Sequence, residues 1–114
     1  MTQQITASSV YAEQLATQLR KGFLAYCVLK VCARKPMYTS DIIQCLSDAE
    51  LVVVEGTIYP LLSRLQKDGL LTHEWQESDQ GPPRKYYKIT EYGHEVMVHI
   101  TKRIHTLNAT LKRL

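Results

Sequence analysis

Two segments of the chain carry hydroxyl and cationic side chains at spacings that suit contacts with DNA. Residues 55–71 show the period of a short helix with one apolar stripe and one polar face. Residues 81–90 join a Gly-Pro-Pro turn to two adjacent cations and a β-forming run. Hydroxyl groups and the N–H groups of a helix start bind phosphates, and cations release counterions from the DNA backbone. A helix followed by a basic hairpin is the arrangement of a winged helix-turn-helix.

The helix over residues 55–68 divides its side chains between a core face and a DNA face. At 100° per residue, the aliphatic side chains fall on one arc and are expected to be buried, namely Ile58, Leu61, Leu62 and Leu65. The candidate DNA-binding residues of the outer face, together with Ser40 from the preceding helix, are Thr57, Tyr59, Ser63, Arg64 and Lys67. Arg64 is the expected base reader, whereas the other side chains suit phosphates, so specificity should lean on DNA shape. The alternative is a solvated face on which Arg64 pairs with Asp68.

The hairpin contributes Arg84 and Lys85 as further candidate DNA-binding residues. The two prolines at residues 82–83 are stiff, so they hold these cations at a set angle with little entropy to lose. Strand alternation predicts that Tyr87 and Ile89 face inward. The alternative is a charged hairpin tip that only keeps an edge strand soluble. Because the helix and the hairpin occur in the order that a winged helix needs, we favour DNA binding.

The elements that position these residues follow from apolar periodicity and from helix start and stop signals. A long first helix is expected from residue 9 until Pro36 stops it, and a short second helix is expected around residues 42–46, after N-cap chemistry at residues 38–41. The remaining predicted elements are a brief strand at residues 51–54, the helix at 55–68, strands at 70–76 and 85–89 with a loop at 78–83 between them, and a last helix from Thr90.

The predicted fold is mainly α with a small β-hairpin, a winged helix-turn-helix of order α-α-α-β-β followed by one more helix. Its expected division is a flexible N-terminus at residues 1–8, a DNA-binding domain with a long first helix at residues 9–89, and a C-terminal dimerisation helix at residues 90–114.

The last helix carries an apolar seam that needs a partner. Its apolar residues recur at alternating spacings of three and four, as in a coiled coil: Met97, Ile100, Ile104, Leu107 and Leu111. The first helix adds Leu15 and Leu19 to a stripe that exceeds what a small core can cover. We therefore expect a homodimer whose two reading helices lie roughly 34 Å apart on a palindromic operator. The alternative is that the last helix packs on its own domain.

Composition narrows the function classes without choosing among them. The 114 residues suit one domain, with 45% hydrophobic and 22% charged residues and a net charge of +3 that permits DNA binding but does not argue for it. The three cysteines, Cys27, Cys32 and Cys45, lack C-x-x-C spacing and are expected in the core, with a redox-sensing thiol as the alternative. No stretch reaches membrane length and the start lacks signal-peptide character, so we expect a cytoplasmic protein without a membrane partner.

The sequence shows no arrangement of residues that is typical of a catalytic site or a metal site. The histidines of the last helix, His94, His99 and His105, are spaced by five and six residues, whereas metal pairs on a helix prefer three or four, so we expect no metal and no cofactor. We also find no catalytic arrangement and expect no enzyme. A winged-helix interaction module without DNA binding is the alternative function, and it would carry an apolar patch in place of the wing cations. Trp75 is either a strand anchor or a stacking platform for an aromatic effector.

The helix motif at residues 55–70 and the Gly-Pro-Pro-Arg-Lys-Tyr-Tyr motif at residues 81–87 resemble the PadR family of bacterial transcriptional regulators, in its short subgroup with a single C-terminal helix. The resemblance implies a homodimeric winged-helix repressor whose third helix enters the major groove and whose wing contacts the DNA backbone or minor groove. It also implies release from DNA by a small, often aromatic, effector. Thr57 and Tyr59 match DNA-contacting helix positions, and Arg84 and Lys85 match wing positions. Val54 departs from the family, in which a polar or small residue often precedes the helix motif.

Overall fold

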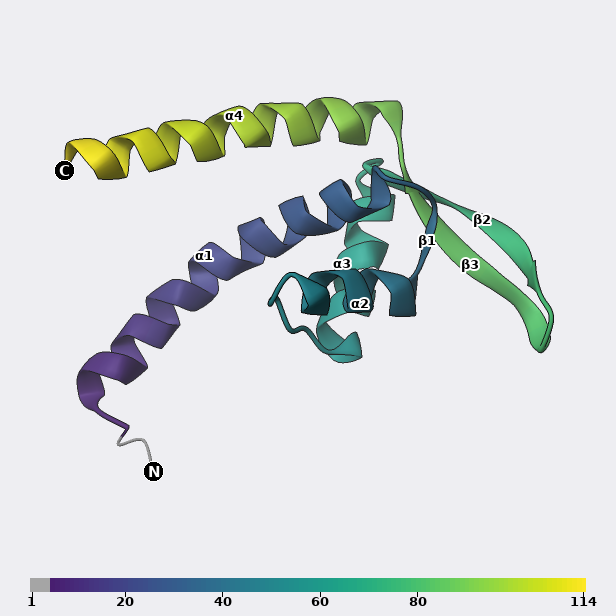
Figure 1. The fold of residues 1–114 in the computed structure, drawn as a ribbon, viewed down its shortest axis with the longest axis horizontal. Coiled ribbons are helices and arrows are strands. Elements are labelled where there is room, and N and C mark those ends of the chain that lie inside the picture. The colour runs from purple at the N-terminus through teal and green to yellow at the C-terminus, as the bar shows by residue number, and fades with distance from the viewer. Residues whose placement is uncertain (1–4) are drawn as a thin grey trace.

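The computed structural model describes residues 5–114 and shows four helices and a three-stranded antiparallel sheet within them (Figure 1). In chain order the elements are α1 (Ala7–Cys32), β1 (Met37–Tyr38), α2 (Thr39–Asp48), α3 (Glu55–Lys67), β2 (Leu71–Ser78), β3 (Gly81–Ile89) and α4 (Glu91–Arg113). The mainly helical winged helix-turn-helix predicted from the sequence is therefore confirmed. Within the described residues, no helix is long and apolar enough to cross a membrane.

The first helix begins two residues earlier than predicted because Thr6 caps it. The Thr6 hydroxyl accepts the Ser9 N–H at 3.1 Å, and the Ser9 hydroxyl accepts the Thr6 N–H at 3.0 Å. This capping box satisfies N–H groups that a helix start otherwise leaves unpaired. Of the segment predicted to be flexible, residues 1–4 lie outside the described residues, whereas Ala7 and Ser8 belong to α1.

The sheet differs from the predicted two-stranded hairpin by one strand. Met37 and Tyr38 pair with Tyr87 and Tyr86, so β3 lies between β1 and β2. A two-residue strand is too short to show a period in the sequence, which is why it was missed. The predicted strand at residues 51–54 is wrong: this run forms no strand, and its side chains alternate between half-buried and exposed beside the core.

The hairpin strands are longer than predicted and shorten the loop between them to two residues, Asp79 and Gln80. Both prolines belong to β3, at residues 82–83. They lie beyond the end of β1 and opposite an irregular part of the β2–β3 pairing, between Gln76 and Ser78. Their missing N–H groups are tolerated there because the regular ladder does not need them.

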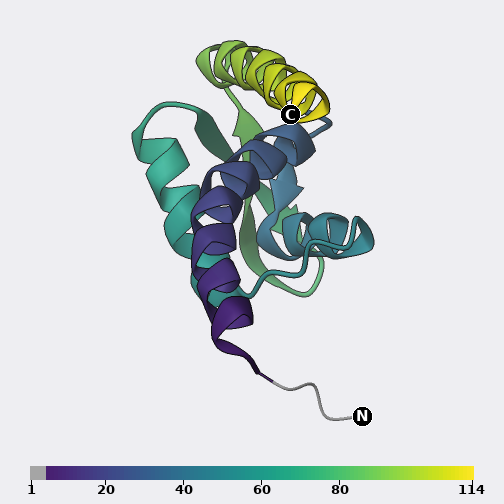
Figure 2. The same ribbon diagram turned by 90° about the vertical axis from the view of Figure 1, so that its left-hand side faces the viewer.

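The core lies where α1, α2, α3 and the sheet meet. Its fully buried side chains include Val28 and Leu29 from α1, Ile42 from α2, and Ile58 and Leu62 from α3. In Figure 2, α2 and α3 lie on opposite sides of α1, with α4 across the top of the view. The predicted core face of α3 is confirmed, with Leu65 buried and Leu61 half-buried, and so is the inward face of β3, with Tyr87 buried and Ile89 packed against the core.

The cysteines are core residues, as predicted. Cys32 is buried, and Cys27 and Cys45 are half-buried against the core; all three are free thiols. Burial raises the pKa of Cys32 to about 12, with a smaller contribution from the neighbouring Cys45, and burial also raises the pKa of Cys27. Because the thiolate is the reactive form, these raised pKa values argue against a redox-sensing role for Cys27 and Cys32.

A tight junction joins the sheet to α4. The chain leaves α3 through Gly69, whose φ of 82° is the left-handed conformation that favours glycine. The Thr90 hydroxyl donates to the Gly69 carbonyl at 2.6 Å and accepts the Gly93 N–H at 2.9 Å, so Thr90 caps α4 and ties it to the end of α3. Gly93 packs directly on the Leu70 backbone, where any Cβ would collide with the Leu70 carbonyl oxygen.

Beyond this junction, α4 runs beside α1, and a hydrogen bond joins the middle of α4 to the last third of α1. The Tyr26 hydroxyl lies 2.6 Å from the Thr101 hydroxyl, which itself donates to the Met97 carbonyl at 2.9 Å. Tyr26 is therefore the donor. Past this point the two helices diverge, and their far ends project from the molecule (Figure 1).

Candidate nucleic-acid interface

The outer face of α3 presents all of its candidate DNA-binding side chains to solvent. Thr57, Tyr59, Ser63, Arg64 and Lys67 are exposed, and so is Ser40 in the first turn of α2. Arg64 Nε lies 3.9 Å from Asp68 Oδ2, with 79% of the Arg64 side chain exposed. Such a loose surface pair is worth little, so the guanidinium stays available to an anionic partner.

The start of α3 lacks a side-chain cap. Val54 is the N-cap residue, with extended backbone angles of φ −102° and ψ 157°, and its side chain has no atom that could accept an N–H. Its backbone carbonyl accepts the N–H groups of Thr57 and Ile58 at 3.0 and 3.1 Å. The first N–H groups of a helix are left without intrahelical partners, so they are open to an anion such as a DNA phosphate.

Replacing Val54 with serine is expected to stabilise the protein by about 1 kcal/mol, because serine at this position can accept an N–H of the first turn. Val54 already has N-cap geometry and is 66% exposed, so the change removes no core packing. The midpoint of chemical denaturation measures the gain. Val52→Ser is the matched control, since Val52 is 79% exposed but lies outside the cap. An equal effect of both substitutions would show that capping is not the cause.

Pro60 lies inside α3, and the helix nevertheless runs without interruption from Glu55 to Lys67. Proline has no N–H to donate to the carbonyl four residues earlier, and its ring crowds that carbonyl. The residue concerned is Gly56, whose surroundings are open, with nothing within 4 Å of the position that a Cβ would take. The N-terminal turns of α3 thus present a small, exposed surface in which the Gly56 carbonyl lacks its usual donor four residues on, followed by hydroxyls and cations.

The wing cations differ in how they are held. The Arg84 guanidinium lies 5.0 Å from the centre of the Tyr38 ring, and the Lys85 ammonium lies 5.2 Å from that of Tyr87. These aromatic partners position the cations without neutralising them. Lys88, by contrast, lies 3.5 Å from a carboxylate oxygen of Glu74 and is paired. Arg84 and Lys85 are therefore the wing cations free to meet an anion.

A cleft of about 350 Å³ separates α3 from the wing. Tyr59 of α3, Tyr38 of β1, and Trp75, Arg84 and Lys85 of the hairpin all line it. None of the lining residues, which all belong to the described part of the chain, is acidic. The structure thus brings the helix and wing candidates together around one concave surface. Tyr38 and Trp75 lie there too, although neither was among the predicted DNA-binding residues.

Trp75 is 64% exposed, so the indole is not buried as the side chain of a strand anchor would be. Leu71, His73 and Trp75 share one face of β2. Along this face Leu71 is buried, His73 is half-buried and Trp75 is exposed. The hairpin projects past the helices, so the face that is inward at its base is uncovered further out. Alternation in the sequence predicts which side chains of a strand face inward, but it does not predict how much of the strand the core covers.

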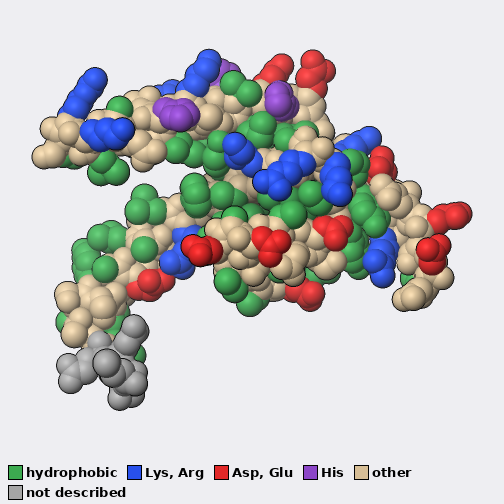
Figure 3. Space-filling model, viewed as in Figure 1, with side chains coloured by type: hydrophobic (Ala, Val, Ile, Leu, Met, Phe, Trp, Pro, Cys, Tyr) green, Lys and Arg blue, Asp and Glu red, His purple; other side chains and the backbone are tan. Residues whose placement is uncertain are grey.

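The tip of the wing has the opposite charge character. Glu77, Asp79 and Arg84 line a separate hollow there together with Tyr86. Figure 3 shows acidic side chains at the outer end of the hairpin. Acidic side chains thus gather at the wing tip, where Arg84 borders both this hollow and the cleft beside α3, whereas Lys85 borders the cleft alone.

Metal-binding geometry is absent from residues 5–114, which contain no cluster of three or more histidine, cysteine or acidic side chains suited to an ion. His94, His99 and His105 are all exposed along α4. These histidines therefore add no chemistry to the surface described above.

Comparison with known proteins identifies the fold's family. Residues 28–99, most of the chain, match the family model described as the transcriptional regulator PadR-like family. The chain belongs to the PadR-like family. Its resemblance to that family, noted from the two motifs, is thus confirmed, and the chain is a DNA-binding transcriptional regulator by family.

Solved PadR-like structures agree over nearly the whole chain. A PadR-like transcription factor from Bacteroides fragilis is 49% identical, with a TM-score of 0.77 over 88% of this chain and 97% of that one. A PadR family regulator from Eggerthella lenta is 31% identical, with a TM-score of 0.81 over 94% of both chains. Among curated proteins, an uncharacterized protein of Lysinibacillus sphaericus is 27% identical over 85 residues, which are 72% of this chain and 78% of that protein.

This PadR-like chain also has a large apolar groove, of about 820 Å³, between α1 and α4. Four of the predicted dimerisation residues line it, Leu19, Ile100, Ile104 and Leu107, together with Phe23 and Tyr26. Figure 3 shows hydrophobic side chains along the facing sides of the two helices. The groove is open along its length because the far ends of the helices diverge.

The other predicted dimerisation residues of the PadR-like chain lie outside the groove lining. Met97 packs against the domain core, so the first half of α4 does pack on its own domain. Leu15 and Leu111 are exposed near the projecting ends of α1 and α4. The most exposed apolar side chains of α4, Leu107 and Leu111, lie in its second half.

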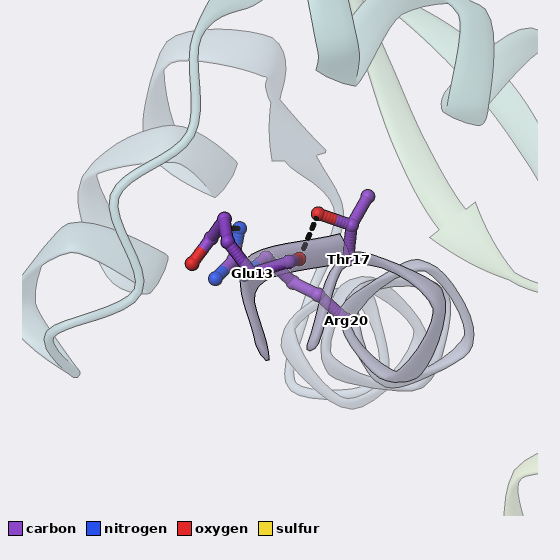
Figure 4. A network of polar contacts seen from close by, with 3 residues as sticks. All are labelled: Glu13, Thr17 and Arg20. Atoms are coloured by element: carbon purple, nitrogen blue, oxygen red, sulfur yellow. Dashed lines mark hydrogen bonds and ion pairs between the residues drawn. The ribbon is translucent and has the colours of Figure 1, made fainter. Parts of the chain in front are cut away.

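A polar strip flanks the apolar side of α1. Arg20 lies 3.2 Å from a carboxylate oxygen of Glu13, and the Thr17 hydroxyl donates to the Glu13 carbonyl at 2.8 Å (Figure 4). These contacts are exposed and add little stability. Arg20 also lines the groove, so the strip marks one border of the apolar surface.

Proposed function

We propose that this protein is a homodimeric repressor that binds a palindromic operator and is released by a small aromatic effector. The observation that carries the dimer is the uncovered apolar groove between α1 and α4, since a soluble monomer rarely exposes so continuous an apolar surface. Repression and effector release rest on the resemblance to the family.

The dimer is best formed by exchange of the α4 ends. In a two-fold arrangement, each chain offers the same surface to the other. The exposed Leu107 and Leu111 of one copy then cover the open groove of its partner. Leu15 and Leu19 of α1 extend the same surface. This arrangement removes the exposed leucines from water and fixes the distance between the two copies of α3.

On DNA, the proposed interface is a backbone clamp with one base reader per subunit. Thr57, Tyr59, Ser63 and Lys67 of α3, with Ser40 of α2, suit phosphates, and Arg64 has the reach to contact a base. Arg84 and Lys85 bind the backbone beside the groove that α3 enters. Specificity then depends on DNA shape and on a half-site spacing of roughly 34 Å.

An effector that releases the operator must bind the DNA-free arrangement more tightly than the DNA-bound one. The α1–α4 groove supports such a role, because it is apolar with aromatic side chains in its wall, Phe23 and Tyr26, and an effector bound there would compete with the α4 end of the partner copy. Its volume lies within the range of small-molecule sites, roughly 300–1,000 Å³.

Replacing Lys85 with alanine is expected to flatten the dependence of log affinity on log salt by about one unit per subunit, or about two for the dimer. The substitution removes one phosphate contact from each wing. Fluorescence anisotropy of a duplex selected from random DNA, titrated across a salt series, measures the slope. Lys102→Ala removes the same charge from the exposed side of α4 and should leave the slope unchanged. Absence of any binding at low salt would refute DNA binding itself.

A further inference from the structure

The sole tryptophan of the chain, Trp75, stands exposed on the concave side of the wing. It lines the cleft between α3 and the hairpin, opposite Lys85 in the strand register and across from Tyr59 of α3. Aromatic side chains of this size contribute most when they are covered, and tryptophan is enriched where a partner docks. An uncovered indole at this place indicates a partner that fills the cleft.

The indole is held in a fixed relation to α3 by its neighbours. His73, on the same face of β2, lies with Nδ1 2.8 Å from the Gln66 side-chain nitrogen of α3. The rings of His73 and Trp75 meet edge to face, with centres 5.9 Å apart at 83°. Because the histidine links the helix to the wing, the tryptophan is positioned before any partner arrives, which lowers the entropy cost of binding.

The charges around the cleft select an anionic occupant. Arg84 and Lys85 line it, and no acidic side chain does; Glu77 and Asp79 line the separate hollow at the wing tip, which Arg84 also borders. A DNA strand combines anionic phosphates with the apolar faces of its sugars. An indole can match both, because its ring is apolar and its Nε1–H is a donor.

We propose that one sugar–phosphate strand of the operator lies in the cleft between α3 and the wing, with Trp75 as a direct contact. Its ring packs on a deoxyribose and its Nε1–H donates to a phosphate, while Tyr59 contacts the same strand from the α3 side. This inference rests on DNA binding by the proposed interface. It goes further by adding a wing contact that is aromatic rather than cationic.

Because Trp75 is the sole tryptophan, its fluorescence reports on this cleft without labelling. The experiment quenches the emission of the intact protein with acrylamide, with and without saturating amounts of a selected duplex. Binding is followed separately by anisotropy of the labelled duplex. The expected result is that bound DNA lowers the quenching constant towards that of a buried indole. Benzoate, as an aromatic anion, should shield Trp75 less than the duplex does.

Substitutions then test the contact. Trp75→Ala is expected to weaken binding about tenfold, as removal of an interface aromatic does, and Trp75→Phe should fall between because it keeps the ring but loses the donor. Tyr92→Ala, which removes an exposed aromatic from α4, is the control and should bind as the original protein does.

The outcomes separate this inference from the proposed function. If the duplex binds while Trp75 stays open to acrylamide and Trp75→Ala binds normally, the strand contact is overturned and DNA binding stands. Shielding by benzoate but not by DNA would overturn it as well, since the cleft would then be a ligand site. If no duplex binds at all, DNA binding and the strand contact both fail.

Discussion

A Leu107→Glu substitution is expected to yield a monomer. Its affinity for an operator duplex should fall at least about 100-fold, because the two copies of α3 no longer bind as parts of one molecule. Leu107 is 64% exposed in the single chain and lines the α1–α4 groove, so a glutamate leaves the domain core intact but places a charge in the proposed interface. Burying that unpaired charge against a partner would cost far more than the contact returns. Sedimentation equilibrium gives the oligomeric state, and duplex anisotropy gives the affinity.

The matched control for this substitution is His105→Glu. His105 is exposed on α4 but does not line the groove, so the new charge stays in water. The His105→Glu protein should remain dimeric and bind DNA with the affinity of the original protein. Circular dichroism checks that both variants keep their helix content. A Leu107→Glu protein that sediments as a dimer and binds like the original would show that the groove is not the dimer interface.

Replacing Gly93 with alanine is expected to lower the free energy of unfolding by about 3 kcal/mol, the upper part of the range for overpacking. The new methyl group would collide with the Leu70 carbonyl oxygen and press on the Ile89 side chain. Neither the Leu70 backbone nor α4 can easily move away, because that carbonyl accepts the Thr90 N–H at 3.1 Å and Thr90 also caps α4.

Urea denaturation measures this loss, with Gly56→Ala as the control. Gly56 is also in the first turn of a helix, but a Cβ there meets nothing within 4 Å. Alanine is the better helix former, so this control should be neutral or slightly more stable. Equal stability of the Gly93→Ala protein and the original would mean that α4 can shift without cost, and the junction would not be rigid.

Much of the fold follows from patterns local to each segment. Ile58, Leu62 and Leu65 recur at helical spacing, so the buried face of α3 and, by difference, its outer face could be predicted without any tertiary information. Gly69 was an equally local signal, since its left-handed backbone ends the helix where the sequence indicates. The wing cations were found because a turn and a β-forming run enclose them.

Long-range information was what the sequence could not supply. The pairing of β1 with β3 depends on residues about fifty positions apart, and two residues carry no period of their own. The run at residues 51–54 contains three valines and so has strand propensity, but it pairs with no strand of the sheet. Trp75 illustrates the same limit at the site, because its exposure depends on how far the hairpin extends past the helices rather than on its neighbours in sequence. Its proximity to Tyr59 likewise required the folded chain.

The junction at Thr90 and the Tyr26–Thr101 hydrogen bond hold the first half of α4, whereas its second half projects from the molecule (Figure 1). The helix has 23 residues and is therefore about 34 Å long. The 12 residues of α4 beyond Thr101 span about 18 Å, so a bend of only about 10° at that contact moves the far end of the helix by about 3 Å. In a dimer joined through the far ends of α4, the relative position of the two copies of α3 then depends on this one hydroxyl contact near the middle of α4. Small changes in side-chain packing at the Tyr26–Thr101 contact would therefore be amplified into a different spacing of the two α3 helices along the DNA.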